Sequence, residues 1–471
     1  MTSVPRLLLI ADIGSEQARH IGDEAMLEAN LDSLRRVFPG AAFTIVARDP
    51  EWAARRYGVD TVSSFDFPRD QAAAAERRSI LAALLESSDN RQHATIDAVA
   101  SADAVIVSGG GNLSSSWPDL LYERAALLQL AHRFGKPSVV LGQTIGPHLG
   151  EDERRLLVAS LAHARFVGVR ELPSAMLAVD LGVRHQRLWY QFDDSMRIDE
   201  PAAVAPDEPT IAVTIDPQLR AAGEALFASL ADQLRMLADA TGARLVLIPH
   251  AFGGEASGNP SDLTEARLLA GKIGASRVSV VEALDVEEAR RAAASASLVI
   301  SSRYHPIVFG LIAGVPSLGI YGDNYCRIKL QGALAHAGLE RRAVTYDDVA
   351  AGALLDASLE LWAARDSIRN GLAARAASWR VECRERWRAV RSALVGESTP
   401  IPPSILFGRP VDEVMPALAS AFSAQQKWSE AALASREAHH RKTELQLQAE
   451  LGPRRTFVRY LAALRSRLGR S

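Results

Sequence analysis

Three adjacent residues, Arg303, Tyr304 and His305, combine side chains that can bind an anion and move a proton. An arginine offers a planar fork of donors that suits phosphate or carboxylate. A histidine two residues later can give or take a proton near neutral pH. The triplet therefore predicts an anion site that contains an acid or a base. The alternative is structural, with Arg303 paired to a carboxylate of the fold and His305 capping a helix.

The residues around this triplet predict a strand followed by a helix. Leu298–Ser301 is a short apolar run typical of a buried strand, and Pro306 suits the first turn of a helix that ends near Ala313. A second strand is expected to end near Tyr321. The triplet thus falls at the carboxyl end of a strand and just before a helix N-terminus, where open α/β sheets bind ligands and free N–H groups attract anions.

A second polar cluster follows the first predicted strand, Leu7–Ala11. Gly22 permits a tight turn, and Asp23 and Glu24 occupy the first turn of a helix that continues to about Phe38. Carboxylates in a first turn can simply stabilise the helix dipole. In the functional alternative, one of the two faces the ligand cleft and holds a sugar hydroxyl.

More candidate binding residues follow other predicted strands of the first half. The strand Ala104–Ser108 runs into a glycine-rich loop, and the strand Pro137–Gly142 runs into a loop that begins with Gln143. Arg170 lies at a further strand-to-helix corner and is a second candidate anion ligand. The glycine-rich loop consists of Gly109, Gly110, Gly111 and Asn112. Consecutive glycines let backbone approach a ligand closely, but the loop lacks the lysine of a phosphate loop and the spacing of a dinucleotide fingerprint.

The alternation of predicted strands and helices indicates an α/β fold. It runs from residue 7 to about 195, stops at a Pro- and Ala-rich linker at 200–209, and restarts with the strand Thr210–Ile215. We predict two Rossmann-like, doubly wound domains that face a cleft, a GT-B-like arrangement with a helical C-terminal extension. The predicted domains are 1–199 and 208–395, followed by a linker at 396–410 and a helical tail at 411–471. The helical, Arg- and Ala-rich stretch from Asp347 to about Leu394 would pack back across both domains.

Composition narrows the classes of function. The 471 residues include 53 Lys and Arg against 56 Asp and Glu, so nothing points to a nucleic-acid partner. The two cysteines, Cys326 and Cys383, exclude a disulfide framework and a cysteine metal cluster, and they fit a reducing compartment. No apolar stretch reaches the ~20 residues of a membrane span. We therefore expect a cytoplasmic protein without a metal site.

The predicted tail ends in a basic amphipathic helix, 457–468, after a largely polar helix at 415–450. Self-association through these helices is the simpler interpretation. The alternative is peripheral contact with the inner face of the membrane, because several arginines lie beside Phe457 and Tyr460.

In their order and spacing, these motifs resemble those of the bacterial polysaccharide pyruvyl transferases. The similar segments are Gly22–Leu27, Gly109–Leu113, Gly142–Pro147, Arg170–Glu171, Ser302–His305 and Ala313–Pro316, followed by Tyr321 and Lys329. The resemblance covers about residues 7–345, and the tail lies outside it. The chain departs from the family pattern at His20-Ile21, where many members have an asparagine, and in a longer segment between Tyr321 and Lys329.

The resemblance implies transfer of a pyruvyl group from phosphoenolpyruvate to two hydroxyls of a sugar of a cell-surface polysaccharide or its precursor. The product is a pyruvate ketal, phosphate is released, and no cofactor is needed besides the donor. The acceptor, on a polymer or linked to a lipid, would lie on the first domain and phosphoenolpyruvate on the second. The residues implied to bind substrate are Arg303, Tyr304, Lys329, Arg170, Gly109, Gly110, Gly111, Asn112, Gln143 and Tyr321, and the implied proton-transfer residues are His305 with Asp23 or Glu24.

Two other functions fit the same sequence. A two-domain glycosyltransferase would use an Arg/Lys pair to hold the diphosphate of a nucleotide sugar. A catalytically silent partner in a polysaccharide assembly complex would use the appended tail to hold its neighbours. Arg303 and His305 argue against the silent partner, and the tail argues for it.

Overall fold

The computed structural model describes residues 5–86, 93–198, 208–253, 261–274, 277–282 and 284–396, and the backbone of the paired strands β17 (Ile405–Leu406) and β18 (Arg409–Pro410). The described residues belong to one compact unit. The predicted tail helices and most of the predicted linker at 200–209 lie outside the described residues, and the predicted domain boundaries stay predictions. No helix in the described ranges has the length and apolar character needed to cross a membrane.

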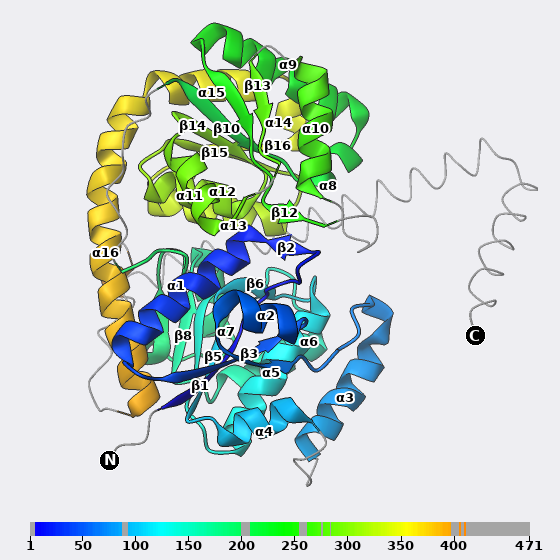
Figure 1. The fold of residues 1–471 in the computed structure, drawn as a ribbon, viewed down its shortest axis with the longest axis vertical. Helices are drawn as coiled ribbons and strands as arrows, with labels where there is room; N and C mark the ends of the chain where they lie inside the picture. The colour runs from blue at the N-terminus through cyan, green and yellow to red at the C-terminus, as the bar shows by residue number, and fades with distance from the viewer. Residues whose placement is uncertain are drawn as a thin grey trace, which may run out of the picture. The chain divides into compact units, whose positions relative to one another are not determined.

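The first half of the chain builds a parallel sheet with the strand order β4-β3-β1-β5-β7-β8-β9, and β6 pairs with β7 (Figure 1). From β1 the chain moves outward to β3 and β4 and then returns to β5, so the topological switch point lies between β1 and β5. The strands are β1 (Arg6–Ile10), β3 (Ala42–Ala47), β4 (Asp60–Ser63), β5 (Ala104–Val107), β6 (Gly110–Leu113), β7 (Ser138–Ile145), β8 (Phe166–Val169) and β9 (Leu188–Tyr190).

The helices of this half connect the parallel strands and cover their continuous apolar runs. Pro118 starts α5 at a position where its missing N–H costs nothing, and Asp49 caps α2 by accepting from the backbone N–H of Trp52. The helices are α1 (Ile21–Val37), α2 (Pro50–Tyr57), α3 (Ala74–Glu86), α4 (Ala94–Ser101), α5 (Pro118–Arg133), α6 (Glu151–Leu161) and α7 (Leu172–Asp180). These strands and helices are called the first lobe below.

The second lobe repeats the same logic with the parallel order β13-β11-β10-β14-β15-β16. Its switch point lies between β10 and β14, because the chain visits β11 and β13 before it returns to β14. Its strands are β10 (Thr210–Thr214), β11 (Arg244–Leu247), β13 (Val278–Val280), β14 (Leu298–Ser301), β15 (Ser317–Tyr321) and β16 (Ala343–Thr345). Its helices are α8 (Pro217–Ala221), α9 (Glu224–Thr241), α10 (Asp262–Ile273), α11 (Val286–Ala294), α12 (Tyr304–Ile312), α13 (Asn324–His336), α14 (Tyr346–Ala350) and α15 (Ala353–Ala363). Two doubly wound sheets confirm the predicted fold class.

Three features join the lobes. The long helix α16 (Arg365–Val395) contacts β7 and β8 of the first lobe and α12 and α15 of the second, as predicted (Figure 1). Trp379 of α16 stacks on Phe192 with ring centroids 4.2 Å apart. A short antiparallel pair, β2 (Arg19–His20) with β12 (Ala251–Phe252), links the lobes a second time. One buried apolar cluster also contains residues of both lobes, so the cleft between them has a shared base.

The structure corrects three predicted local assignments. Gly110–Leu113 is a strand instead of a loop, and Gln143–Ile145 continues β7, because these two segments pair with each other. The helix α12 begins at Tyr304, two residues earlier than predicted, so that Tyr304 and His305 lie inside its first turn and Arg303 is its N-cap. The backbone N–H of Arg303 is held by the Ser301 hydroxyl at 2.9 Å, which turns the chain directly from β14 into the helix.

Candidate functional site

A cleft of about 770 Å³ lies where the carboxyl ends of the two sheets face each other. Residues that closely follow strands at the two switch points line it, among them Asp12 after β1, Asp216 after β10 and Arg303 after β14. Gly111 of β6 lines it as well. This is the place where doubly wound sheets bind ligands.

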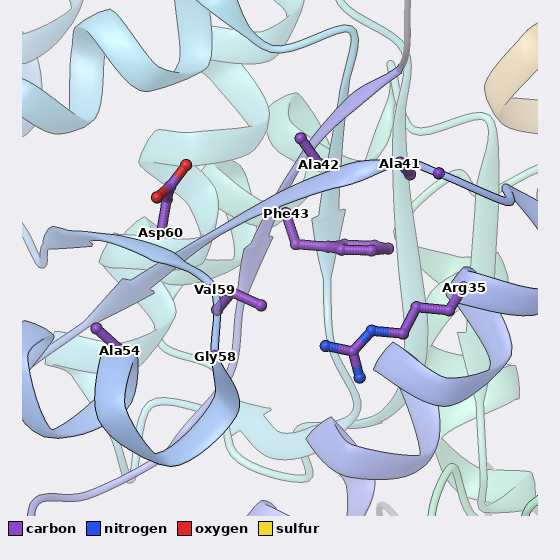
Figure 2. Close-up of a pocket in the computed structure, with 9 residues that line it drawn as sticks. Arg35, Ala41, Ala42, Phe43, Ala54, Gly58, Val59 and Asp60 are labelled. Atoms are coloured by element: carbon purple, nitrogen blue, oxygen red, sulfur yellow. The ribbon is translucent and has the colours of Figure 1, made fainter.

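A second, open groove lies on the first lobe between α1, α2 and β3 (Figure 2). The guanidinium of Arg35 lies 5.7 Å from the centre of the Phe43 ring there, and Asp60 is the carboxylate of the lining. The groove lies beside β3 and β4, which form one edge of the sheet. Its lining lacks the histidines and the clustered charges of the cleft. The cleft is therefore the candidate functional site.

Arg303 lines the cleft and pairs with a carboxylate of the fold. Its Nη2 lies 2.7 Å from Oδ1 of Asp262, and its side chain is still 33 % exposed. Burial opposes the charge of the guanidinium, but Asp262 and Asp216 outweigh it and raise the pKa of Arg303, so the group stays charged. The structural alternative predicted for Arg303 is thus present, and it fixes the guanidinium at the cleft wall.

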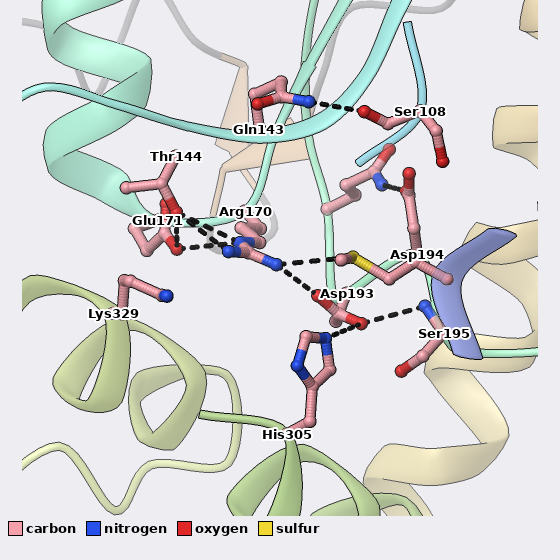
Figure 3. A network of polar contacts seen from close by, with 12 residues as sticks. Ser108, Gln143, Thr144, Arg170, Glu171, Asp193, Asp194, Ser195, His305 and Lys329 are labelled. Carbon is pink, nitrogen blue, oxygen red and sulfur yellow. Dashed lines mark hydrogen bonds and ion pairs between the residues drawn. The ribbon is translucent and has the colours of Figure 1, made fainter. Parts of the chain in front are cut away.

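His305 lines the cleft, and the Nε2 atom of its ring is buried and points toward Asp193 (Figure 3). Its Nε2 is 3.7 Å from Oδ1 of Asp193, which is too long for a hydrogen bond, and it has no hydrogen-bond partner in the described part of the chain. Burial lowers the pKa of His305 to about 3, although the Asp193 carboxylate opposes this shift. The imidazole is therefore neutral at pH 7, and it does not cap the helix.

Gly22 makes room for this histidine. A Cβ atom at position 22 would lie 1.7 Å from Nδ1 of His305, far inside van der Waals contact. Gly22 belongs to α1 of the first lobe and His305 to α12 of the second, so the absence of a side chain lets the two lobes meet at the reactive group.

Arg170 lies under the cleft with its donors already engaged (Figure 3). Nη1 donates to Asp193 at 2.8 Å, Nε donates to Glu171 at 3.0 Å, and the guanidinium lies 4.2 Å from the centre of the Tyr304 ring. Its exposure is 1 %. Arg170 still lines the cleft, and its predicted role as an anion ligand stays a prediction, because its guanidinium already pairs with the carboxylates that offset its desolvation.

Asp193 is the acceptor that links Arg170 to the histidine. Burial opposes its ionisation, but His305, Arg170 and the backbone N–H of Ser195 outweigh burial and lower the pKa of Asp193. The N–H of Ser195 donates to Oδ1 at 2.8 Å. Asp193 thus stays ionised and fixes a negative charge beside the neutral imidazole.

Lys329 is a cation of the cleft that pairs with no carboxylate in the described part of the chain. Its ammonium lies 5.4 Å from the centre of the Tyr304 ring and 4.8 Å from that of Tyr325. The Tyr325 hydroxyl donates to the backbone oxygen of Gly111 at 2.8 Å. This hydrogen bond joins α13 of the second lobe to the first lobe. An ammonium that lines the cleft and pairs with no carboxylate of the described residues is suited to an anionic ligand.

The two acidic residues of α1 have different places. Asp23 lines the cleft, and burial together with the Asp12 carboxylate raises the pKa of Asp23 to about 7. Glu24 is fully buried behind the cleft wall and pairs with Arg19 at 2.7 Å. Successive side chains of a helix point about 100° apart, so only one of the pair can face the ligand. Glu24 is therefore a structural residue, contrary to one of the two predicted alternatives.

Of the other predicted binding residues, Tyr304, Gly111 and Asn112 line the cleft, and the following do not: Gly109, Gly110, Gln143 and Tyr321. Gln143 is fully buried and donates to the backbone oxygen of Ser108, and Gly109 packs against the Asp194 carboxylate. Gln143 and Tyr321 lie in β7 and β15, where neighbouring side chains point to opposite faces of the sheet.

Sequence reasoning missed several residues that line the cleft: Asp12, Arg48, Arg69, Trp117, Asp216, His250 and Tyr325. Asp12 and Asp216 could have been found, because each follows the first strand of its lobe closely. Arg69 and Trp117 lie in connections that carry no recognisable motif. Within the described ranges, no group of three or more His, Cys, Asp and Glu residues is arranged to hold a metal ion.

Comparison with known proteins adds a family and a fold. The model of the family described as polysaccharide pyruvyl transferase matches residues 20–324 of the chain. No curated protein matches the chain.

Two similar solved structures share the fold at low sequence identity. A Listeria monocytogenes protein described as a UDP-N-acetylglucosamine 2-epimerase has a TM-score of 0.56 and 14 % identity, with 86 % of this chain and 100 % of that chain covered. Anabaena HepE in complex with UDP and glucose has a TM-score of 0.53 and 13 % identity, with 83 % and 100 % covered. At such identities the likeness shows the two-domain fold alone.

Proposed function

Because the chain belongs to the polysaccharide pyruvyl transferase family, and is thus a transferase, we propose that it moves the pyruvyl group of phosphoenolpyruvate onto a sugar of a cell-surface polysaccharide or its precursor. The product is a cyclic pyruvate ketal, and phosphate is released. One observation carries this proposal. A single cleft is lined by Lys329, which pairs with no carboxylate among the described residues, by His305, whose imidazole is neutral, and by Asp23, whose pKa is about 7.

The second lobe would bind the donor. Phosphoenolpyruvate carries a phosphate and a carboxylate, and Lys329 and Arg303 supply cations from α13 and from the start of α12. No side chain caps the N-terminus of α12, so N–H groups of its first turn remain available to an anion. These contacts fix the donor with its reactive carbons near His305.

The first step adds a proton to the methylene carbon, C3, of phosphoenolpyruvate and leaves a cationic centre at C2. A sugar hydroxyl then forms a C–O bond to C2 and loses its proton. C2 now carries the methyl group, the carboxylate, the phosphate and the sugar oxygen. We assign these proton transfers to His305 and Asp23, which both line the cleft.

The second step breaks the bond between C2 and the phosphate oxygen, and inorganic phosphate leaves. A second hydroxyl of the same sugar attacks C2 and gives up its proton, which closes the ketal. Two hydroxyl protons are lost in total, one is retained on C3, and the other leaves with phosphate or solvent. Lys329 and Arg303 would stabilise the departing phosphate charge.

The pKa values of the two proton-transfer groups fit this sequence once the donor is bound. The pKa of His305 is about 3 in the free protein, and a bound anion would raise it because it stabilises the imidazolium. Asp23, with a pKa of about 7, exists in both protonation states at neutral pH. A base that can accept a hydroxyl proton and return it is thus present on the acceptor wall.

The decisive experiment is isothermal titration calorimetry of the full chain with phosphoenolpyruvate and, separately, with a panel of nucleotide sugars. We expect saturable binding of phosphoenolpyruvate that is weakened at least about 10-fold in Arg303→Ala, since a charge-assisted hydrogen bond contributes about 1.5–3 kcal/mol. Arg78→Ala is the matched control, because Arg78 is an exposed arginine of α3 paired with Asp152 outside the cleft.

Other outcomes would redirect the assignment. Binding of a nucleotide sugar in place of phosphoenolpyruvate would assign the cleft to glycosyl transfer. If neither ligand binds, a silent partner in polysaccharide assembly becomes the better interpretation. Deletion of residues after 397 then tests the tail, because an enzyme should keep its activity while an assembly partner should lose its neighbours.

A further inference from the structure

Most arginines of the cleft are neutralised by the protein itself. Arg48 pairs with Asp119 at 2.8 Å, Arg170 with Asp193 at 2.8 Å, and Arg303 with Asp262 at 2.7 Å. Arg69 differs, because it is exposed and pairs with no carboxylate in the described part of the chain. It belongs to the connection between β4 and α3 of the first lobe.

Arg69 lies against an aromatic ring that also lines the cleft. Its guanidinium carbon is 5.2 Å from the centre of the Trp117 ring, and Trp117 is the N-cap of α5. The indole is only partly buried, and the neighbouring Ser116 and Leu120 line the cleft with it. An aromatic face next to polar groups is typical of sites that bind sugar rings, which have apolar faces and polar edges.

The charge on this wall of the cleft explains why Arg69 is left unpaired. Asp12 and Asp23 face the cleft from the same lobe and would repel the anionic donor, which finds Lys329 and Arg303 on the other lobe. A neutral sugar gains little from an unpaired guanidinium. An anionic group on the acceptor would pair with Arg69 and be kept apart from the two carboxylates.

We propose that Trp117 and Arg69 form an acceptor subsite for an anionic saccharide, with a sugar ring on Trp117 and a phosphate or carboxylate of that saccharide on Arg69. Both anions offer oxygens that accept from a guanidinium, so both sources share one chemistry. The role as an acceptor subsite rests on the proposed function, whereas the preference for an anionic sugar can be measured without any reaction.

The test compares three ligands built on one sugar ring, in the glucose, galactose and mannose series: the neutral methyl glycoside, the glycosyl 1-phosphate with its anion at C1, and the methyl glycoside of the uronic acid with its anion at C6. Affinities are measured by calorimetry with the full chain at low and high salt. We expect at least one anionic ligand to bind about 10-fold more tightly than its neutral counterpart, with a preference that shrinks as salt is added. Arg69→Ala should remove the preference and leave the affinity for the neutral glycoside unchanged.

Variants at Trp117 test the aromatic half of the subsite. Trp117→Ala should weaken neutral and anionic ligands alike, and Trp117→Phe should restore most of the affinity in case the alanine variant unfolds. Arg78→Ala, an arginine outside the cleft, should match the wild type with every ligand. A preference for the phosphate alone identifies a glycosyl phosphate, and a preference for the uronide alone identifies an acidic sugar, and either supports the proposal.

Equal affinity of wild type and Arg69→Ala for both anionic ligands, or no preference in any series, would overturn it. Arg69 would then only cover the Trp117 ring. Titration of phosphoenolpyruvate with the same proteins separates this failure from failure of the proposed function. Wild type and Arg69→Ala should bind phosphoenolpyruvate equally. If neither protein binds phosphoenolpyruvate, this result counts against the proposed transfer reaction and not against the preference for an anionic sugar.

Discussion

The two lobes repeat one topology but bring different charges to the cleft. At the switch point of the first lobe, the carboxylate Asp12 lies two residues after β1, and the segment after β5 is rich in glycine. At the switch point of the second lobe, Asp216 caps α8 and Arg303 starts α12. His305 belongs to the second lobe and meets the first lobe at Gly22.

This difference shows how one fold can hold two unlike substrates. The sheet order fixes where ligands bind, whereas the side chains at the strand ends determine whether the site favours an anionic or a neutral ligand. A wall with carboxylates suits hydroxyls that must lose protons, and a wall with cations and helix N–H groups suits a phosphorylated acid. The predictions below test this division of labour, from the largest expected effect to the smallest.

The largest effect is expected from His305→Gln in the second lobe. Glutamine keeps a polar side chain but cannot move a proton, so phosphate release should fall about 10²–10⁴-fold while phosphoenolpyruvate still binds. Release is measured with a phosphate-sensing assay and binding by calorimetry. His148→Gln, an exposed histidine outside the cleft, is the control. Unchanged release in His305→Gln would remove the histidine from the mechanism.

The next effect concerns the contact between the lobes. In Gly22→Ala the new Cβ would collide with His305, and the ring or the lobes must shift, which should slow phosphate release about 10²-fold. Gly271→Ala is a matched helical control, because a Cβ there meets nothing within 4 Å. That control should keep its activity and gain about 0.5–1 kcal/mol of stability. Equal activity of the two variants would show that the lobes do not need this contact.

The role of the first lobe is tested by the variant Asp23→Asn, through the pH dependence of stability and activity. The folded-state pKa of about 7 lies above the ordinary 3.8, so the folded protein holds a proton that the unfolded chain has lost. The contribution of Asp23 to the free energy of unfolding is therefore fully present below about pH 4 and is lost as the pH rises through about 7.

Asparagine at position 23 cannot ionise. The melting temperature of Asp23→Asn relative to wild type should accordingly increase from pH 5 to pH 8, and the activity limb near pH 7 should disappear. Asp32→Asn, an exposed carboxylate of the same helix, should show neither change. A constant difference in melting temperature across this range would mean that the pKa of Asp23 is not raised.

The smallest effect is expected from Tyr325→Phe. It removes one hydrogen bond between the lobes, from the hydroxyl to Gly111 at 2.8 Å, and should cost about 0.5–1.5 kcal/mol of stability with a few-fold loss of kcat/KM. Tyr57→Phe is the control, since the Tyr57 hydroxyl has no hydrogen-bond partner within the described residues. Thermal melts and phosphate release compare the two variants. If both variants behave alike, Tyr325 does not hold the lobes together.

The elements could largely be predicted because their signals are local. The apolar run of β14 was predicted with the bounds found in the structure, and α1 ends at Val37, one residue before the predicted Phe38. The errors occur where a partner strand supplies the hydrogen bonds, as in β6 and the end of β7. A glycine-rich segment gives no local indication that it will join a sheet.

The candidate site was predicted only in part. Arg303, His305, Lys329 and Asp23 line the cleft as expected, because each lies at a strand end or in the first turns of a helix. Arg170 also lines the cleft but pairs with the buried Asp193, whereas Glu24 does not line it and pairs with Arg19. The side chains of Arg170 and Glu24 are as polar as those of the other predicted residues, and spacing along the chain does not reveal what lies opposite each of them.

The sequence by itself determined the α/β class, the restart of the pattern after residue 209 and the polar residues at the strand ends, since periodicity and helix-start signals act over a few residues. Tertiary structure decided which residues share the cleft. Asp193 meets His305, Gly22 admits its ring, and Arg69 stays unpaired beside Trp117, all through contacts between segments far apart in sequence. Charge, burial and pKa depend on those distant neighbours, so they became visible only in the folded chain.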